Sequence, residues 1–199
     1  MGQMVVFDLG NVLVDWDPFE TQRGEVSRAD WDAFLSRTDF WEFNRLLDGG
    51  LDFDEARRVF TEEHAEDADF LDRYLGRFGE SIRGNIPGME QVVADLKARG
   101  TRIAGLSNWP EQTYHFAEER SSLVGELEDV VVSGRVKMRK PNPDIFHYML
   151  DLYGVPAGDV VFVDDVQENV DAAASLGIDA VLFTGADDLR AELVARGLI

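Results

Sequence analysis

Carboxylates follow two apolar runs of this chain at the points where those runs end. Asp8 comes directly after "VVF", and Asp164 and Asp165 come directly after "VVFV". A carboxylate can act as a nucleophile, and paired carboxylates supply the hard oxygen ligands that Mg²⁺ prefers. The three residues therefore predict a magnesium site beside a nucleophilic Asp8.

Hydroxyl, amide and ammonium groups accompany these carboxylates. Ser107 and Asn108 end the apolar run "RIAGL", and Lys140 lies in "RKPNPDIF". Singly, such residues are common in turns and at helix starts. Together with a carboxylate nucleophile and a divalent cation, they are the groups that phosphoryl transfer through a covalent intermediate needs. The set predicts that chemistry, with Lys140 facing an anionic substrate.

Short apolar runs alternate with helical patterns along most of the chain. Further runs at 102–108, 129–133, 160–165 and 179–183 are continuously apolar, which is typical of strands covered on both faces. Helical periodicity lies between them, and ends at Gly100, Gly154 and Gly177. The pattern predicts an α/β fold with a doubly wound parallel sheet. Ligands bind beyond the carboxyl ends of such strands, where Asp8, Ser107 and Asp164 lie.

Residues 17–85 interrupt this alternation. The segments 31–50, 53–63 and 68–78 predict amphipathic helices inserted after the first strand. We therefore expect a core of residues 1–16 and 86–199 and a helical cap of residues 17–85, which would exclude water from the site. Its aromatic residues are interpreted mainly as the cap's own core.

Charge and composition restrict the partners. The chain has 19 basic and 39 acidic residues, a net charge of −20, which disfavours nucleic acid and anionic membranes. It has no cysteine, so disulfides and thiolate chemistry are excluded. The first residues lack the pattern of a signal peptide, and no apolar run has membrane-spanning length, so we expect a cytoplasmic protein. The sequence does not indicate the oligomeric state.

The segments "FDLGNVLVD", "LSN", "KP" and "FVDD" occur in this order along the chain. In this order they resemble the signature motifs of haloacid dehalogenase superfamily hydrolases, in particular small phosphatases with a helical cap, such as the glucose-1-phosphate type. The resemblance implies a Rossmann-like core, Mg²⁺ as cofactor, and hydrolysis of a small phosphorylated metabolite through a phosphoaspartyl intermediate. A sugar phosphate is favoured on the resemblance alone.

The resemblance implies metal ligands at four positions. Asp8 would be nucleophile and ligand, and the backbone carbonyl of Gly10 a second ligand. Asp165 would coordinate Mg²⁺ directly, and Asp164 either directly or through one water.

It also implies phosphate-binding groups. Ser107 and Asn108 would bind the phosphate, and Lys140 would contact both the nucleophile and the phosphate. Lys137 is the competing lysine, but Lys140 precedes a proline as the family pattern requires. Asn169 would brace the acidic loop.

Gly10 departs from the family pattern, in which most phosphatases have an aspartate there as general acid and base. Such assistance contributes about 10²–10⁴-fold, a small part of the acceleration of phosphate ester hydrolysis. With this position empty, esters with acidic leaving groups should be preferred, unless a residue of the insert donates the proton. Arg45 and Asp48 are the insert residues considered for the site, although an exposed helix face is the simpler interpretation.

Two other functions stay open. A metal-independent 2-haloacid dehalogenase would use the same aspartate, but gains nothing from the adjacent Asp164 and Asp165, which repel each other. A catalytically weak phosphate-binding or regulatory protein is supported only by Gly10. Trp109 is interpreted as buried packing, with a pocket wall as the alternative.

Overall fold

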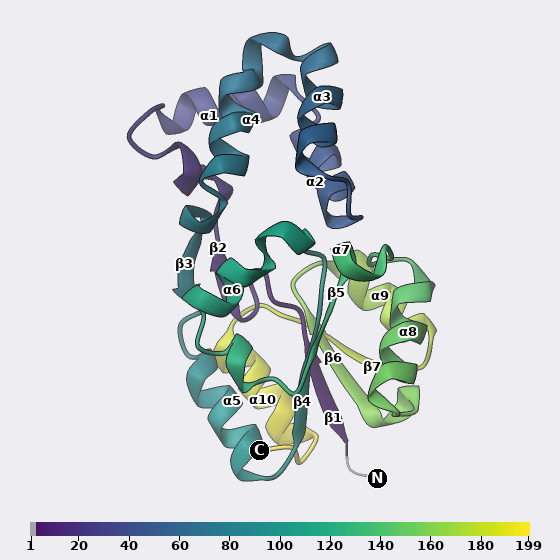
Figure 1. Ribbon diagram of the computed structural model, residues 1–199. Coiled ribbons are helices and arrows are strands. Elements are labelled where there is room, and N and C mark those ends of the chain that lie inside the picture. The colour runs from purple at the N-terminus through teal and green to yellow at the C-terminus, as the bar shows by residue number, and fades with distance from the viewer. Residues whose placement is uncertain (1–2) are drawn as a thin grey trace.

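A five-stranded parallel sheet forms the centre of the computed structural model, which describes residues 3–199 (Figure 1). The order across the sheet is β5-β4-β1-β6-β7, and every neighbouring pair is parallel. The strands are β1 (Met4–Phe7), β4 (Arg102–Ser107), β5 (Val130–Val132), β6 (Val160–Asp164) and β7 (Asp179–Leu182). All five coincide with the apolar runs, so the predicted doubly wound α/β fold is confirmed.

Helices cover both faces of this sheet. Val5 and Phe7 of β1 pack in one core cluster with α5 (Met89–Ala98) and α10 (Ala186–Ala195). Met4 and Val6 point to the other face and pack with α8 (Pro143–Tyr153) and α9 (Gln167–Ser175). Because successive residues of a strand face opposite ways, a strand between two helical layers must be apolar throughout.

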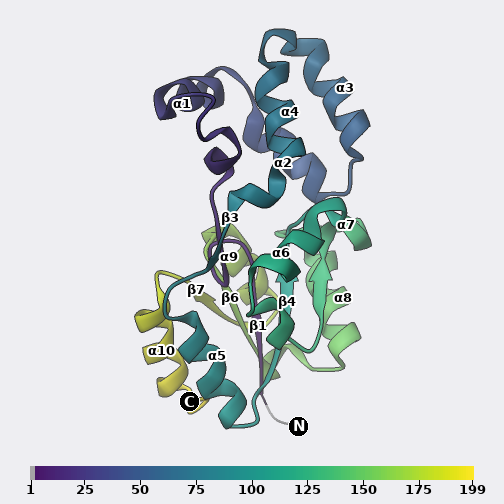
Figure 2. The same ribbon diagram turned by 60° about the vertical axis from the view of Figure 1, so that its left-hand side comes forward.

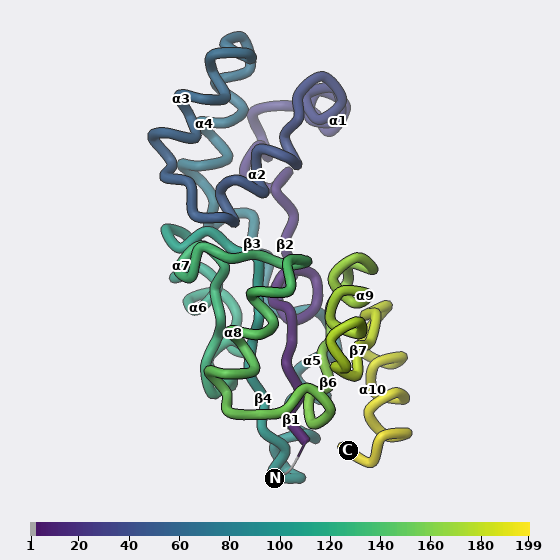
Figure 3. Tube along the Cα trace, turned by 90° about the vertical axis from the view of Figure 1, so that its right-hand side faces the viewer, coloured from purple at the N-terminus to yellow at the C-terminus, as the bar shows by residue number. Residues whose placement is uncertain are grey.

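The segment after β1 forms a two-stranded ribbon and a group of helices. In the ribbon, β2 (Val14–Trp16) pairs antiparallel with β3 (Ile82–Asn85). Between these strands lie α1 (Arg28–Arg37), α2 (Phe40–Asp48), α3 (Phe53–Glu63) and α4 (Ala68–Gly76), which we call the cap helices. They lie beyond the carboxyl ends of the parallel strands, and the C-terminus lies at the opposite end of the molecule (Figure 3).

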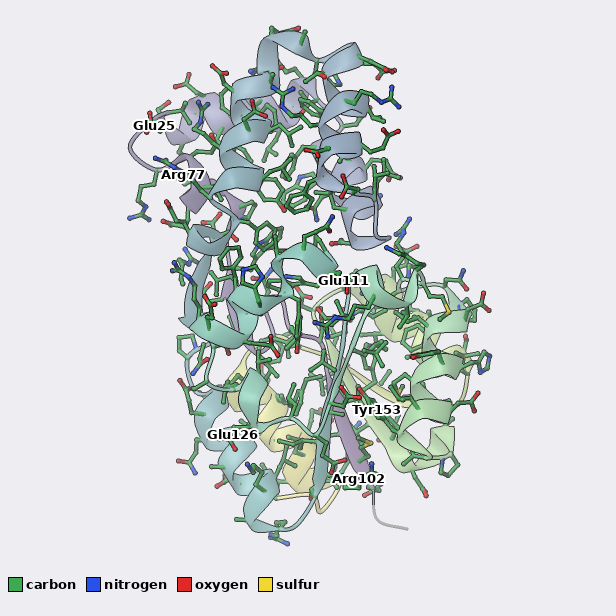
Figure 4. All side chains as sticks on the ribbon, viewed as in Figure 1. Glu25, Arg77, Arg102, Glu111, Glu126 and Tyr153 are labelled. Atoms are coloured by element: carbon green, nitrogen blue, oxygen red, sulfur yellow. The ribbon has the colours of Figure 1, made fainter. Side chains whose placement is uncertain are left out.

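Aromatic residues form the interior of the cap helices. Phe34 stacks on Phe70 with ring centroids 4.7 Å apart, and Trp31 stacks on Phe34 at 5.1 Å. At the surface, Arg77 after α4 pairs with Glu25 in the loop before α1 at 3.3 Å (Figure 4). In the view of Figure 2, α1 lies to the left of α2, α3 and α4, with its Phe34 in contact with Phe70 of α4. Most aromatic side chains of the insert thus have a packing role.

The remaining helices are short. The α-helices are α6 (Tyr114–Arg120) and α7 (Ser133–Val136); the 3₁₀ helices are η1 (Pro18–Gln22), η2 (Ala65–Asp67), η3 (Phe78–Ser81), η4 (Glu111–Thr113), η5 (Val124–Glu126) and η6 (Ala157–Asp159). No helix among residues 3–199 is long and apolar enough to cross a membrane.

Candidate active site

Three polar strand ends meet at the centre of the sheet. Asp8 follows β1, while Ser107 and Asp164 are the last residues of β4 and β6, the two strands that flank β1. The chain extends the sheet on one side through β4 and β5 and then crosses to β6 on the other. This change of direction produces the crevice in which open α/β sheets bind ligands.

Lys140 joins two of these strand ends. Its Nζ lies 2.9 Å from Oδ1 of Asp8 and 2.6 Å from Oδ2 of Asp164, and it donates a further hydrogen bond to the carbonyl of Leu106 at 2.9 Å. The Lys140 side chain is fully buried. Lys137, the competing lysine, instead donates to the carbonyl of Gly50 in the loop between α2 and α3, 3.0 Å away.

The two adjacent aspartates have different surroundings. Both oxygens of Asp164 are occupied, because Lys140 contacts Oδ2, and the Val166 N–H and the Asn169 side chain donate to Oδ1 at 2.9 and 3.0 Å. Asp165 is only partly buried and lines the cavity described below. Asn169 therefore holds the loop that carries both carboxylates.

Oxygen atoms of Asp8, Asp164 and Asp165 all lie within 4.8 Å of one another. Three carboxylates around one ammonium group leave an excess of negative charge in a largely buried space. A set of hard oxygen donors with this charge fits Mg²⁺, and does not fit a softer metal that prefers nitrogen or sulfur.

Burial shifts the pKa values of these groups. Burial raises the pKa of Asp8 to about 7 against the opposing charge of Lys140, with Asp164 and Asp165 adding to the rise. The pKa of Asp165 is also raised, by burial and then by the charge of Asp164. For Lys140, burial acts to lower the pKa, but Asp8 and Asp164 outweigh it, and the pKa is raised. A bound cation would favour the ionised carboxylates.

Ser107 and Asn108 differ in their hydrogen bonding. The Asn108 side chain pairs with the backbone of Lys140, accepting from its N–H at 2.9 Å and donating to its carbonyl at 3.0 Å. Asn108 therefore fixes the backbone that presents Lys140. Ser107 is almost fully buried, and its Oγ has no hydrogen-bond partner within residues 3–199.

A cavity of about 160 Å³ lies over Asp8 and Gly10. Its wall combines core residues with residues of β2 and the cap helices, namely Asn11, Trp16, Asn44, Asp48, Tyr74, Phe78, Asn108, Trp109, Pro110, Asp165 and Val166. The indole Nε1–H groups of Trp16 and Trp109 are buried without acceptors in the described part of the chain. Trp109 is thus buried and also lines the cavity, so buried packing and a place in the pocket wall are compatible for this residue.

The two cap residues singled out in the sequence differ in position. The Arg45 side chain is 53% exposed and pairs with Glu42 at 2.7 Å, and it lines only a wider groove that continues past the cavity. Asp48 is buried and lines both the cavity and the groove. The sequence carried no signal that distinguished Asp48 from the exposed carboxylates around it.

A family model described as haloacid dehalogenase-like hydrolase matches residues 3–177. The chain belongs to this family. The match covers most of the parallel sheet and all of the cap helices, and it includes each strand end named above. Membership in this family accounts for the order of the segments "FDLGNVLVD", "LSN", "KP" and "FVDD" along the chain.

Two curated relatives align over nearly the whole chain. The drimenol cyclase drtB of Aspergillus calidoustus is 31% identical over 97% of this chain. The aligned region is only 36% of that longer protein, so this chain spans about a third of it. The sesquiterpene phosphatase astK of Aspergillus oryzae is 24% identical, covering 98% of this chain and 95% of its own length. Phosphatases are therefore present among its relatives.

The fold also matches solved structures of the family. A family enzyme from Bacteroides thetaiotaomicron, solved as an Asp-to-Ala variant in complex with magnesium and inorganic phosphate, has a TM-score of 0.67 at 19% identity, covering 93% of this chain and 95% of that chain. Dehalogenases share the fold as well. At a sequence identity this low, the similarity to these structures shows a shared fold and nothing about activity.

Proposed function

We propose that this hydrolase is a Mg²⁺-dependent phosphatase that forms a phosphoaspartyl intermediate on Asp8. The observation that carries the proposal is the buried bridge from Lys140 to Asp8 and Asp164, within a cluster of three carboxylates that opens to a cavity. A phosphatase needs a cation and an anion-binding group beside its nucleophile. A metal-free dehalogenase has no use for the third carboxylate.

Asp8, Asp165 and the Gly10 carbonyl would hold the ion, with Asp164 in direct or water-mediated contact. When bound, Mg²⁺ supplies positive charge to the phosphoryl oxygens and to the carboxylate cluster. Phosphoryl transfer spreads negative charge over oxygen atoms. The Lys140 ammonium would stabilise that charge and orient the Asp8 carboxylate for in-line attack on phosphorus.

Two buried polar groups at the cavity support a substrate rich in oxygen. The Nε1–H groups of Trp16 and Trp109 have no partners within residues 3–199, and both residues line the cavity. Buried donors are normally paired, so donors left unpaired at a cavity indicate a ligand that supplies acceptors. The oxygens of a small phosphorylated metabolite, such as a sugar phosphate, would do so.

We further propose that residues 17–85 act as a cap, and that the protein is cytoplasmic.

The test is turnover of a panel of phosphorylated metabolites and of a 2-haloacid, each with Mg²⁺ and with chelator. Phosphate should be released only with Mg²⁺, and activity should return when Mg²⁺ is restored. Asp165→Ala should raise the Mg²⁺ concentration needed for half activity more than Asp164→Ala, since the oxygens of Asp164 are already bonded within the protein. If the protein instead dehalogenated the 2-haloacid in chelator and released no phosphate from any metabolite, the phosphatase proposal would be wrong and the chain would be a dehalogenase.

A further inference from the structure

Gly10 provides no side chain for proton transfer, yet the fold has space for one. A Cβ atom added to Gly10 would meet no atom within 4 Å. Steric crowding therefore does not explain the glycine. If this chain uses an acid and base in phosphate ester hydrolysis, the group has to reach the cavity from another element.

Asp48 reaches the cavity from the cap helices. It is the last residue of α2 and is only 9% exposed. Its side chain shares the wall of the cavity with Asp8 and Gly10, although 40 positions separate it from Asp8 in the chain. A carboxyl group thus stands on the cap side of the space that lies over the nucleophile.

The contacts of Asp48 leave most of its carboxyl group available. The hydrogen bond that it receives comes from Asn44 Nδ2 at a long 3.4 Å. Tyr74 donates its hydroxyl proton to Oδ1 of the same amide at 2.5 Å, and this bond turns the amide nitrogen of Asn44 toward Asp48. Asn44 and Tyr74 also line the cavity, so the three side chains form a single polar wall.

The surroundings of Asp48 favour its protonated form. Burial raises the pKa of Asp48 to about 7, and the charge of Asp8 adds to the rise. The end of α2 acts in the same direction, because the carbonyl groups at a helix C-terminus disfavour a negative charge. The charges of Arg139, Lys140 and Arg45 act in the opposite direction but do not outweigh burial, and Tyr74 is a further titratable group close to Asp48. A carboxylic acid with this pKa can give and take a proton near neutral pH.

The core holds Asp48 in place through its backbone. Ser133, the residue after β5, donates its Oγ–H to the Asp48 carbonyl at 2.5 Å and accepts the Trp109 N–H at 2.9 Å. Lys137 adds the hydrogen bond to Gly50 two residues later. The residues that carry these contacts follow β4 and β5, so segments of the core next to the site also position α2.

We infer that Asp48 is the general acid and base of this enzyme, supplied by the cap helices in place of residue 10. The inference rests on the proposed phosphatase function. An Asp8 oxygen attacks phosphorus, the bond from phosphorus to the leaving oxygen breaks, and the Asp48 proton passes to that oxygen to release an alcohol. The Asp48 carboxylate then takes a proton from a water that attacks the phosphoaspartate, which regenerates Asp8 and yields inorganic phosphate.

The test compares an alkyl ester, glycerol phosphate, with an activated aryl ester, p-nitrophenyl phosphate, in the presence of Mg²⁺. Asp48→Asn should lower kcat/KM, which reports the phosphorylation of Asp8, by about 10²–10⁴-fold for the alkyl ester and by less than about tenfold for the aryl ester, since the aryl leaving group needs no proton. It should lower kcat for both esters, because hydrolysis of the phosphoaspartate is common to them. Adding Gly10→Asp to Asp48→Asn should restore part of the alkyl ester turnover. Asp54→Asn, an exposed carboxylate on α3, is the matched control and should change neither ester.

The outcomes separate this inference from the proposed function. Equal losses of kcat/KM with both esters, or no loss with either, would overturn the role of Asp48 while leaving the phosphatase intact. If the wild-type enzyme hydrolyses no phosphate ester of any leaving-group acidity with Mg²⁺, the proposed function fails and the inference fails with it.

Discussion

Buried carboxyl groups dominate the chemistry of this molecule at the scale of single residues. Asp8 and Asp164 share the fully buried ammonium of Lys140, whereas Asp48 has no such cation and accepts one long hydrogen bond from Asn44. Burying a charge without a close partner costs free energy, so a group such as Asp48 weakens the fold whenever it ionises. A residue retained at such a cost is typical of a functional site.

This cost gives a prediction for stability. The pKa of Asp48 rises from 3.8 to about 7 on folding, so its favourable contribution is complete below pH 3.8 and is lost as the pH passes 7. At about 1.4 kcal/mol per pH unit, the loss amounts to roughly 4 kcal/mol at most. Asp48→Asn should therefore raise Tm at pH 8 by several degrees and change it little at pH 4.

Thermal unfolding in metal-free buffer at the two pH values measures this difference, with Asp54→Asn as control. An equal change of Tm at both pH values would mean that the free energy of unfolding does not depend on ionisation of Asp48.

The sequence predicted some of these residues and not others. Asp8, Ser107 and Asp164 could be predicted because each follows its own apolar strand, and parallel strands end at one edge of a sheet. Lys140 could be chosen over Lys137 because a proline follows it, as the family pattern requires. Asp48 could be named only as one candidate for the site, because the direction of its side chain depends on how α2 packs on the core. The roles of all these residues stay predictions.

At the scale of elements, the loop between α2 and α3 lies against α7. Gly50 in this loop has φ +90°, and an added Cβ atom would lie 2.8 Å from the carbonyl oxygen of Gly134 and 2.3 Å from Nζ of Lys137. Lys137 can move, whereas the backbone of α7 cannot. The loop thus needs glycine to bring Asp48 to the core.

Gly50→Ala tests this positioning. The added methyl group should push the end of α2 away from α7 and lower kcat/KM for an alkyl phosphate by roughly tenfold or more, with a smaller effect on kcat/KM for an aryl phosphate. Gly24→Ala is the matched control, because Gly24 has a similar φ of +84° but open space around its Cβ position. Equal kinetics in both variants would show that backbone strain alone, rather than contact with α7, explains the effect.

Some elements could not be predicted from the pattern of residues. The β2–β3 ribbon was not expected, because its strands have only three and four residues and 65 residues lie between them in sequence. The helix α10 was also missed. Within segment 31–50 the chain forms two helices rather than one, with a break at Thr38 and Asp39. The domain boundaries at residues 17 and 85 stay a prediction.

At the scale of the whole molecule, the net charge of −20 surrounds a site that we propose binds an anion. Long-range repulsion would slow the approach of a phosphate ester, and it weakens as salt screens the charges. Binding would therefore have to come from local groups, namely Lys140 and a cation held by the three carboxylates. The fold places Lys140 and these carboxylates at the centre of its sheet, where the ends of β1, β4 and β6 meet.

The most direct measurement of covalent catalysis is acid quenching during turnover of a phosphate ester labelled on its phosphoryl group, with Mg²⁺ present. Wild-type chain should carry the label on Asp8, and the label should be absent when Mg²⁺ is chelated. Asp8→Asn, folded by circular dichroism, should carry no label and should lose at least about a hundredfold in turnover, because an amide is not a competent nucleophile. Wild-type turnover without any labelled chain, or an Asp8→Asn variant that keeps its activity, would contradict phosphoryl transfer through Asp8.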